Sequence, residues 1–312
     1  MLLTDNIMLQ IWDGIVSMYK NFLSVKYAEL TAVDLLEDSL YELVSKCLCL
    51  EELRLIRCNF SSSSLELNSP ESNLKCLPLA MSLSTFQLCC NSSIKSHHVT
   101  PLSTMQKVLL KQESNSIIMK KNEHMLFFNL LKDLHNVKVL TLFFRYLEVL
   151  DTNAGRSLLP LLCNLKHLDI TLLLAENELP SLMCLLRNSP SLETLSMNLH
   201  LDRYNRAKDI YDEDEVTIPE QPLLPSDSVM HLTKIDITNF QGLKAEMEFV
   251  KIMLQSSLCL KEMVICISSR YEYLKKSFGK MFYEVLQKKR DAAVENVLAC
   301  PCVSPDARIL IK

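Results

Sequence analysis

Apolar residues recur along the chain in one fixed order. Leu50, Leu53 and Leu55 form the pattern L-x-x-L-x-L, which Cys58 and Phe60 extend. The same core returns, with aliphatic substitutes, at Val137/Leu140/Leu142, Leu165/Leu168/Ile170, Leu192/Leu195/Met197, Leu232/Ile235/Ile237 and Leu260/Met263/Ile265. Recurrence at 20 to 30 residues is typical of repeats that share one core by stacking.

This recurrence predicts an α/β fold, an irregular leucine-rich-repeat solenoid. A parallel sheet is expected on the concave face, with helices and loops on the convex face. The interval is 28 residues from Val137 to Leu165 but 40 from Leu192 to Leu232, so an insertion is expected between the last two. That insertion, residues 201–228, is an acidic run followed by prolines and is interpreted as a solvated loop.

The patterns divide the chain into an irregular start at 1–29, a solenoid over 30–228 and a C-terminal domain over 229–312. Strands are predicted at Leu30/Val33/Leu35, Met105/Val108/Leu110 and 306–311. Helices are predicted at 38–44, 123–134, 179–188, 245–255 and 273–299.

The residues between the inward leucines alternate to the opposite face of each strand. The middle positions are Arg54, Thr141, Asp169, Ser196, Asp236 and Val264. A stacked array of repeats binds partners through such a face. The candidate partner-binding residues on the concave face are Arg54, Thr141, His167, Asp169, Ser196, Lys234 and Asp236.

Composition excludes several classes of function. The chain of 312 residues has only 4 glycines, whereas phosphate loops, dinucleotide folds and nucleophile elbows need glycine for tight turns. Its net charge of −4 provides no global basic field for nucleic acid. No signal peptide or membrane span is evident, so a cytoplasmic or nuclear location is expected, with no contact to a membrane.

The 12 cysteines contain no C-x-x-C pair, so a zinc site is not expected. Most lie among aliphatic residues and are interpreted as buried free thiols, which behave as small apolar side chains. This set comprises Cys47, Cys49, Cys58, Cys76, Cys163, Cys184, Cys259 and Cys266. No cofactor, metal site or catalytic residue is predicted.

Two stretches carry a resemblance to a known family. Residues 40–58, which end in Leu50-Glu51-Glu52-Leu53-Arg54-Leu55-Ile56-Arg57-Cys58, resemble the repeat of plant F-box/leucine-rich-repeat proteins. The tail resembles the FBD domain that ends many of them. The matching segments are 232–242, 246–254, 260–265 and 300–309, the last containing Ser304-Pro305-Asp306-Ala307-Arg308-Ile309.

The resemblance implies a non-catalytic protein-recognition module, similar to the substrate-binding part of an F-box-type ubiquitin-ligase adaptor. Residues 229–312 would then be an FBD-like helix–strand cap. The chain shows no F-box pattern, and Trp12 is its only tryptophan. A Skp-type linker of a cullin ligase is therefore expected as a partner only if an F-box is supplied or cryptic. Three interpretations of the chain remain open: it is a truncated product, a gene fragment, or a binder that competes with full-length relatives.

Two alternatives of other classes remain. His167 and Asp169 stand two residues apart on a predicted strand and are the nearest candidates for an enzyme site. The basic helix at 275–290 is the candidate for a nucleic-acid or polyanion contact.

Overall fold

Stacked parallel strands form the body of the protein in the computed structural model. The structure describes residues 6–10, 25–32, 34–35, 47, 49–60, 83–90, 105–112, 134–143, 161–172, 178–199, 229–267 and 280–312. The helices predicted at 38–44 and 123–134 and the acidic insertion at 201–228 lie outside these residues, apart from Leu134.

The chain divides into two compact units, which are described separately. Unit 1 comprises Met1–Val149 and Leu158–Asn164, and unit 2 comprises Leu150–Ser157 and Leu165–Lys312. A division by contacts does not test the domain boundaries predicted at 29 and 228, which stay predictions.

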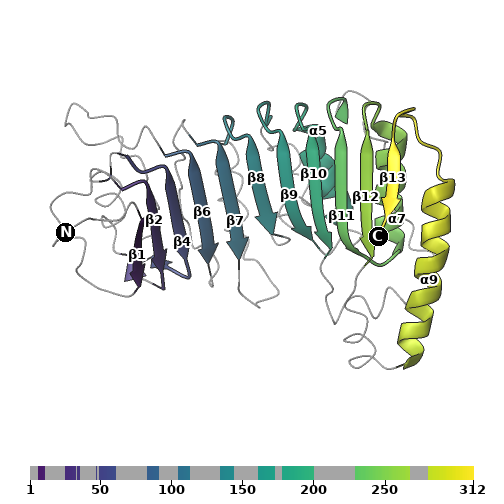
Figure 1. Ribbon diagram of the computed structural model, residues 1–312, viewed down its shortest axis with the longest axis horizontal. Coiled ribbons are helices and arrows are strands. Elements are labelled where there is room, and N and C mark those ends of the chain that lie inside the picture. The colour runs from purple at the N-terminus through teal and green to yellow at the C-terminus, as the bar shows by residue number, and fades with distance from the viewer. Residues whose placement is uncertain are drawn as a thin grey trace. The chain divides into compact units, whose positions relative to one another are not determined.

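Unit 1 contains a parallel sheet whose strand order follows the sequence (Figure 1). Its strands are β1 (Asn6–Gln10), β2 (Tyr27–Thr31), β4 (Glu52–Ile56), β6 (Thr85–Cys90), β7 (Lys107–Gln112) and β8 (Val139–Phe143). A short pair, β3 (Asp34–Leu35) and β5 (Asn59–Phe60), lies beyond β2 and β4.

The N-terminal part of unit 1 differs from the sequence prediction. β1 pairs in parallel with β2 where an irregular start was predicted. The strand predicted over Leu30–Leu35 is broken after Thr31, because Ala32 adopts a left-handed φ of 56°. Arg57 turns the chain in the same way after β4, with φ 54°. Cys58 then donates its thiol hydrogen to the carbonyl of Leu30 at 3.3 Å, which ties the two turns together.

Unit 2 also contains a parallel sheet, and its described residues include three helices. Its parallel strands are β9 (His167–Leu172), β10 (Thr194–Leu199), β11 (Lys234–Phe240), β12 (Glu262–Ile267) and β13 (Arg308–Ile311). Its helices are α5 (Glu178–Arg187), α7 (Lys244–Ser256) and α9 (Lys280–Ala299). Figure 1 shows α5 and α7 behind the strands of this unit. The predicted helices at 179–188 and 245–255 are confirmed within one residue at each end.

Inward strand positions build the core of each unit. Leu53, Leu55, Leu140 and Leu142 are fully buried in unit 1, and Leu168 and Leu195 are fully buried in unit 2. Each such leucine contributes roughly 1.5–3 kcal/mol when it leaves water. The repeating L-x-x-L-x-L pattern is therefore the hydrophobic core itself, as predicted.

A backbone contact repeats just before each strand and sets the register. The carbonyl of Lys26 accepts from the amides of Glu51 and Glu52 at 2.8 and 3.0 Å. The carbonyl of Glu51 accepts in turn from Ser84 and Thr85, both at 3.0 Å. Unit 2 shows the same contact three times. The carbonyl of Lys166 accepts from the amides of Glu193 and Thr194. The carbonyl of Glu193 accepts from Thr233 and Lys234, and that of Thr233 accepts from Lys261 and Glu262. Each repeat thus satisfies backbone groups of the next.

A buried polar cluster joins α7 and α9 to β11. The Glu246 carboxylate, only 1% exposed, accepts from the amides of Gln241 and Leu243 at 2.8 and 3.2 Å. The second bond is half of a capping box, in which the N3 acid satisfies the N-cap amide. Arg290 of α9 donates to the side-chain oxygen of Gln241. The cluster anchors α9, in which Ala293 and Val297 of the apolar pattern predicted over 273–299 are buried, whereas Leu298 of the same pattern is exposed.

The cysteines are less uniformly buried than the sequence predicted. Cys47, Cys58 and Cys184 are buried, but Cys49, Cys163 and Cys259 are exposed. The exposed three lie in the short turns that precede β4, β9 and β12.

The alternation of inward and outward positions makes a direct prediction for unit 2. Leu168→Ala should lower the free energy of unfolding by about 2–5 kcal/mol, because it leaves a cavity under the sheet. Asp169→Asn should change it by less than about 0.5 kcal/mol, because Asp169 is exposed. Urea denaturation measures both, and equal losses would show that the assigned orientation of β9 is wrong.

Candidate binding surface

The outward strand positions of unit 1 form three rows across the sheet. Glu29, Arg54, Gln87, Leu109 and Thr141 are in register from β2 to β8. The row before it is Tyr27, Glu52, Thr85, Lys107 and Val139. The row after it contains Thr31, Ile56, Cys89 and Lys111. We call these positions the outward face of unit 1.

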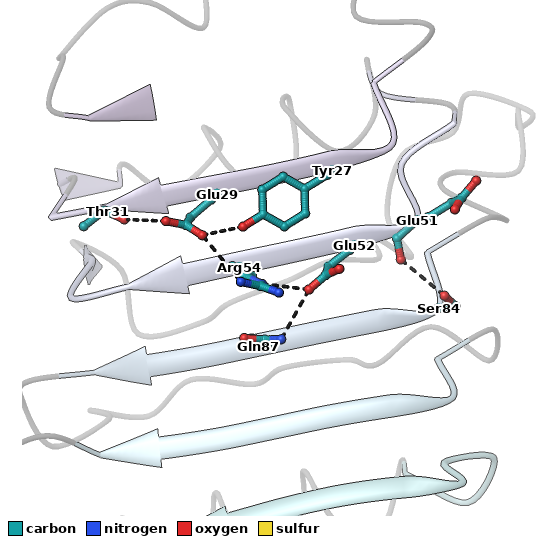
Figure 2. A network of polar contacts seen from close by, with 8 residues as sticks. All are labelled: Tyr27, Glu29, Thr31, Glu51, Glu52, Arg54, Ser84 and Gln87. Atoms are coloured by element: carbon teal, nitrogen blue, oxygen red, sulfur yellow. Dashed lines mark hydrogen bonds and ion pairs between the residues drawn. The ribbon is translucent and has the colours of Figure 1, made fainter. Parts of the chain in front are cut away.

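Arg54 is the centre of a polar network on this face (Figure 2). Its Nε donates to Glu52 Oε1 at 2.7 Å, and its guanidinium pairs with Glu29 Oε2 at 3.8 Å. The guanidinium also lies 5.1 Å from the centre of the Tyr27 ring. Gln87 Nε2 donates to Glu52 Oε1 at 3.2 Å. Arg54, predicted to bind a partner, is therefore already held by two carboxylates and an aromatic ring.

The network changes the titration of Tyr27. Burial raises the pKa of its hydroxyl to about 12, aided by the hydrogen bond that this hydroxyl donates to the Glu29 carboxylate. Both causes favour the neutral phenol, because ionisation would place a second anion beside Glu29. Hydrogen bonds to Glu52 and attraction to Glu52 raise the pKa of Arg54 in spite of its own burial.

The outward face of unit 2 brings five predicted residues together. Asp169, Ser196 and Asp236 are in register on β9, β10 and β11. His167, Thr194 and Lys234 form the neighbouring row. Neighbouring parallel strands lie about 4.8 Å apart, so the five predicted residues, His167, Asp169, Ser196, Lys234 and Asp236, share a small surface.

Lys234 is the charged centre of this surface. Its Nζ lies 3.2 Å from Asp236 Oδ2 and 3.5 Å from Glu262 Oε2. The hydrogen bond to Asp236, with attraction to that carboxylate, raises the pKa of Lys234. Both units thus hold an outward cation between two acids, one on its own strand and one on a neighbouring strand.

One outward position differs from the predicted exposure. Val264, predicted to face solvent, is only 7% exposed. Its neighbour in register on β13 is Leu310, which is 40% exposed. The two apolar side chains continue the row of Asp169, Ser196 and Asp236 toward β13.

The two alternative sites are placed as follows. His167 and Asp169 both lie exposed on β9. In the predicted basic helix, residues 275–279 lie outside the described part, Lys288 is exposed, and Arg290 is only 4% exposed. Arg290 therefore belongs to the core cluster and not to a basic surface.

The parts of the chain that are described contain no group of three or more His, Cys, Asp or Glu side chains arranged for a metal ion. None of the helices described is long and apolar enough to cross a lipid bilayer.

Comparison with protein families decides the classification. Residues 16–299 match the family model described as the At1g61320/AtMIF1, LRR domain. The chain belongs to this leucine-rich-repeat family. No curated protein matches it. Leucine-rich-repeat domains are typically non-catalytic protein-interaction modules, and stacked repeats of this kind use an extended sheet face.

Sequence reasoning missed part of the outward face of this leucine-rich-repeat protein. Tyr27 and Glu29 precede the strand start predicted at Leu30, so their alternation was not recognised. The sequence analysis predicted a strand with Val108 and Leu110 as its apolar positions. Strict alternation along that strand would have placed the flanking residues Lys107, Leu109 and Lys111 on the outward face.

The raised pKa of Tyr27 predicts how stability depends on pH. Because its folded pKa lies above the ordinary tyrosine pKa of 10.0, its contribution to stability is complete below pH 10 and is lost as pH rises toward about 12. Tyr27→Phe should remove one late transition from the tyrosinate absorbance titration of the 9 tyrosines. A variant titration that superimposes on the parent's above pH 11 would contradict the network.

Proposed function

We propose that this leucine-rich-repeat protein is a non-catalytic recognition module that binds a protein partner on the outward faces of its strands. The proposal rests on membership of the family together with the register of the outward rows. Core residues occupy the inward positions, so the outward positions are the ones that can vary in chemistry without loss of the fold.

One observation carries the proposal. Ion pairs and hydrogen bonds hold the outward charged side chains in position before any partner arrives. Arg54 contacts Glu29, Glu52 and Tyr27, and Lys234 contacts Asp236 and Glu262. Side chains that are already ordered lose less conformational entropy on binding, which favours specific recognition.

We further propose that the module is the substrate-binding part of an adaptor similar to plant F-box/leucine-rich-repeat proteins, with an FBD-like domain at 229–312. The segments that support this are 232–242, 246–254, 260–265 and 300–309. In the structure they correspond to β11, α7, β12 and the approach to β13. In this proposal the chain recognises the target protein. Docking to a Skp-type linker depends on an F-box that is either supplied to the chain or cryptic in it.

Site-specific photocrosslinking tests the binding face. A photoreactive phenylalanine analogue replaces Thr141 in unit 1 or Ser196 in unit 2, and the control carries it at Glu295, which is exposed on α9. In the cells that express the chain, Thr141 and Ser196 should give crosslinks to a discrete protein, and Glu295 should not. The same pull-down, analysed by mass spectrometry, shows whether a Skp-type linker co-purifies.

The outcomes separate the two levels of the proposal. Crosslinks from the strands without a Skp-type linker support recognition and contradict the adaptor role. Crosslinks from Glu295 alone would show that the helical side binds the partner, and the proposed face would be wrong.

A further inference from the structure

A cavity of about 250 Å³ opens between α7 and α9 in unit 2. Its apolar floor consists of Val250 and Val297, which are each 1% exposed, and of the half-buried Met247. The lining contains none of the described outward strand residues, so the cavity is separate from the binding surface on the strands. We call it the α7–α9 cavity.

Two contacts hold the walls of the α7–α9 cavity in place. Near the middle of α9, Arg290 donates to the side-chain oxygen of Gln241, which lies just before α7. Beyond the end of α9, the amide of Val303 donates to the carbonyl of Leu254 in the last turn of α7, at 3.0 Å. The two helices are therefore positioned before a ligand arrives, and binding requires little further ordering of the walls.

A carboxylate, an ammonium group and an amide complete the lining. Glu248 is half-buried, and Lys251 and Asn296 are exposed. Glu248 and Lys251 are three residues apart on α7, which places them on the same face of the helix. Within the described part of the chain, none of these three side chains makes a hydrogen bond or an ion pair. Both signs of charge thus stand beside the apolar floor and can bind a ligand.

The thiol of Cys300 faces the same space as Lys251. Burial raises the pKa of this thiol, and the positive charge of Lys251 opposes that rise. The electrostatic effect links α7 to the residue that follows α9, so the ammonium group and the thiol border one cavity. Because the pKa of Cys300 is raised, its thiol stays neutral near pH 7 and does not compete with an anionic ligand for Lys251.

We propose that the α7–α9 cavity binds a free α-amino acid with an aliphatic side chain, such as leucine. The side chain of the ligand covers Val250 and Val297. Its carboxylate accepts hydrogen bonds from Lys251 and Asn296, and its ammonium group donates to Glu248. The carboxylate and ammonium group of an α-amino acid are attached to one carbon, so they complement opposite charges that stand close together on one helix face.

The size and charge of the cavity favour this class of ligand over others. A cavity of about 150 Å³ holds one benzene molecule, so in proportion 250 Å³ holds about ten non-hydrogen atoms. Leucine is of this size, whereas a nucleotide is far larger. A carboxylic acid without an amino group would place a second carboxylate beside Glu248, and an amine without a carboxylate would leave Lys251 without an anion.

Ligand-observed NMR titration of the full chain tests the inference with leucine and three related probes. Leucine should bind with a Kd below about 1 mM. N-acetyl-leucine lacks the ammonium group, leucinamide lacks the carboxylate, and glycine lacks the aliphatic side chain. Each of these three probes should bind at least about tenfold more weakly than leucine, because each loses one of the three proposed contacts.

Matched variants assign the two charged contacts. Lys251→Gln should weaken leucine binding at least about tenfold and leave the weak binding of leucinamide unchanged, because leucinamide has no carboxylate. Glu248→Gln should weaken leucine binding similarly and leave that of N-acetyl-leucine unchanged. The controls Lys288→Gln and Glu295→Gln make the same charge changes at exposed positions of α9 outside the lining and should leave leucine binding intact.

Cysteine alkylation locates the bound ligand independently of affinity. Saturating leucine should slow the reaction of Cys300 with iodoacetamide, because the ligand fills the cavity that the thiol borders. Cys259 is exposed and lies outside the lining, so its rate should not change. Mass spectrometry of the alkylated peptides measures both rates in one sample.

Three results would overturn the inference. The first is no binding of leucine at concentrations up to about 10 mM. The second is equal affinity for leucine and for any of the three related probes, since the cavity would then not recognise that group. The third is leucine binding that survives both Lys251→Gln and Glu248→Gln without protecting Cys300. The proposed function is tested separately, because neither Thr141 nor Ser196 lines the cavity.

Discussion

Burial of the inward aliphatic row is the constraint on which the structure depends. In the parallel sheet of each unit, strands of four to seven residues place alternate side chains under the sheet, and no repeat can enclose those side chains alone. Stacking in parallel, guided by one carbonyl that accepts two amides from the next repeat, closes the core. The outward rows then follow without further specification, because period-two alternation leaves them on the other face.

Polar contacts act on this frame in two ways. Outside, Arg54 and Lys234 draw carboxylates from neighbouring strands together and order the surface across repeats. Inside unit 2, Glu246 and Gln241 satisfy backbone and side-chain groups that α7 and α9 would otherwise bury at a cost of about 1–3 kcal/mol each. The exposed network favours specificity, and the buried cluster favours one placement of the helices.

The sequence predicted those features that hydrophobic periodicity encodes. The inward leucines of the repeats and the ends of α5 and α7 were predictable, since Pro180 and Pro190 mark the first turn and the region after α5. The turn before each strand was not predictable, because the residue that is buried there differs between repeats. It is Cys47 in one repeat and Ser189 or Ser257 in others. Nor was the burial of Arg290, which depends on Gln241 far away in the sequence. On the candidate surface, the predicted residues of unit 2 lie together. The outward placement of Tyr27, Glu29 and Lys107 could not be predicted without the strand bounds.

The central claim is that a protein partner covers the outward strand face. Lysine acetylation followed by mass spectrometry measures this most directly, on the free chain and on the chain bound to the protein captured from Thr141 or Ser196. Lys107 and Lys234 should lose reactivity on binding in the unit that the partner covers, while Lys251 and Lys288 on α7 and α9 keep theirs. Protection of Lys251 and Lys288, with Lys107 and Lys234 unchanged, would contradict the account.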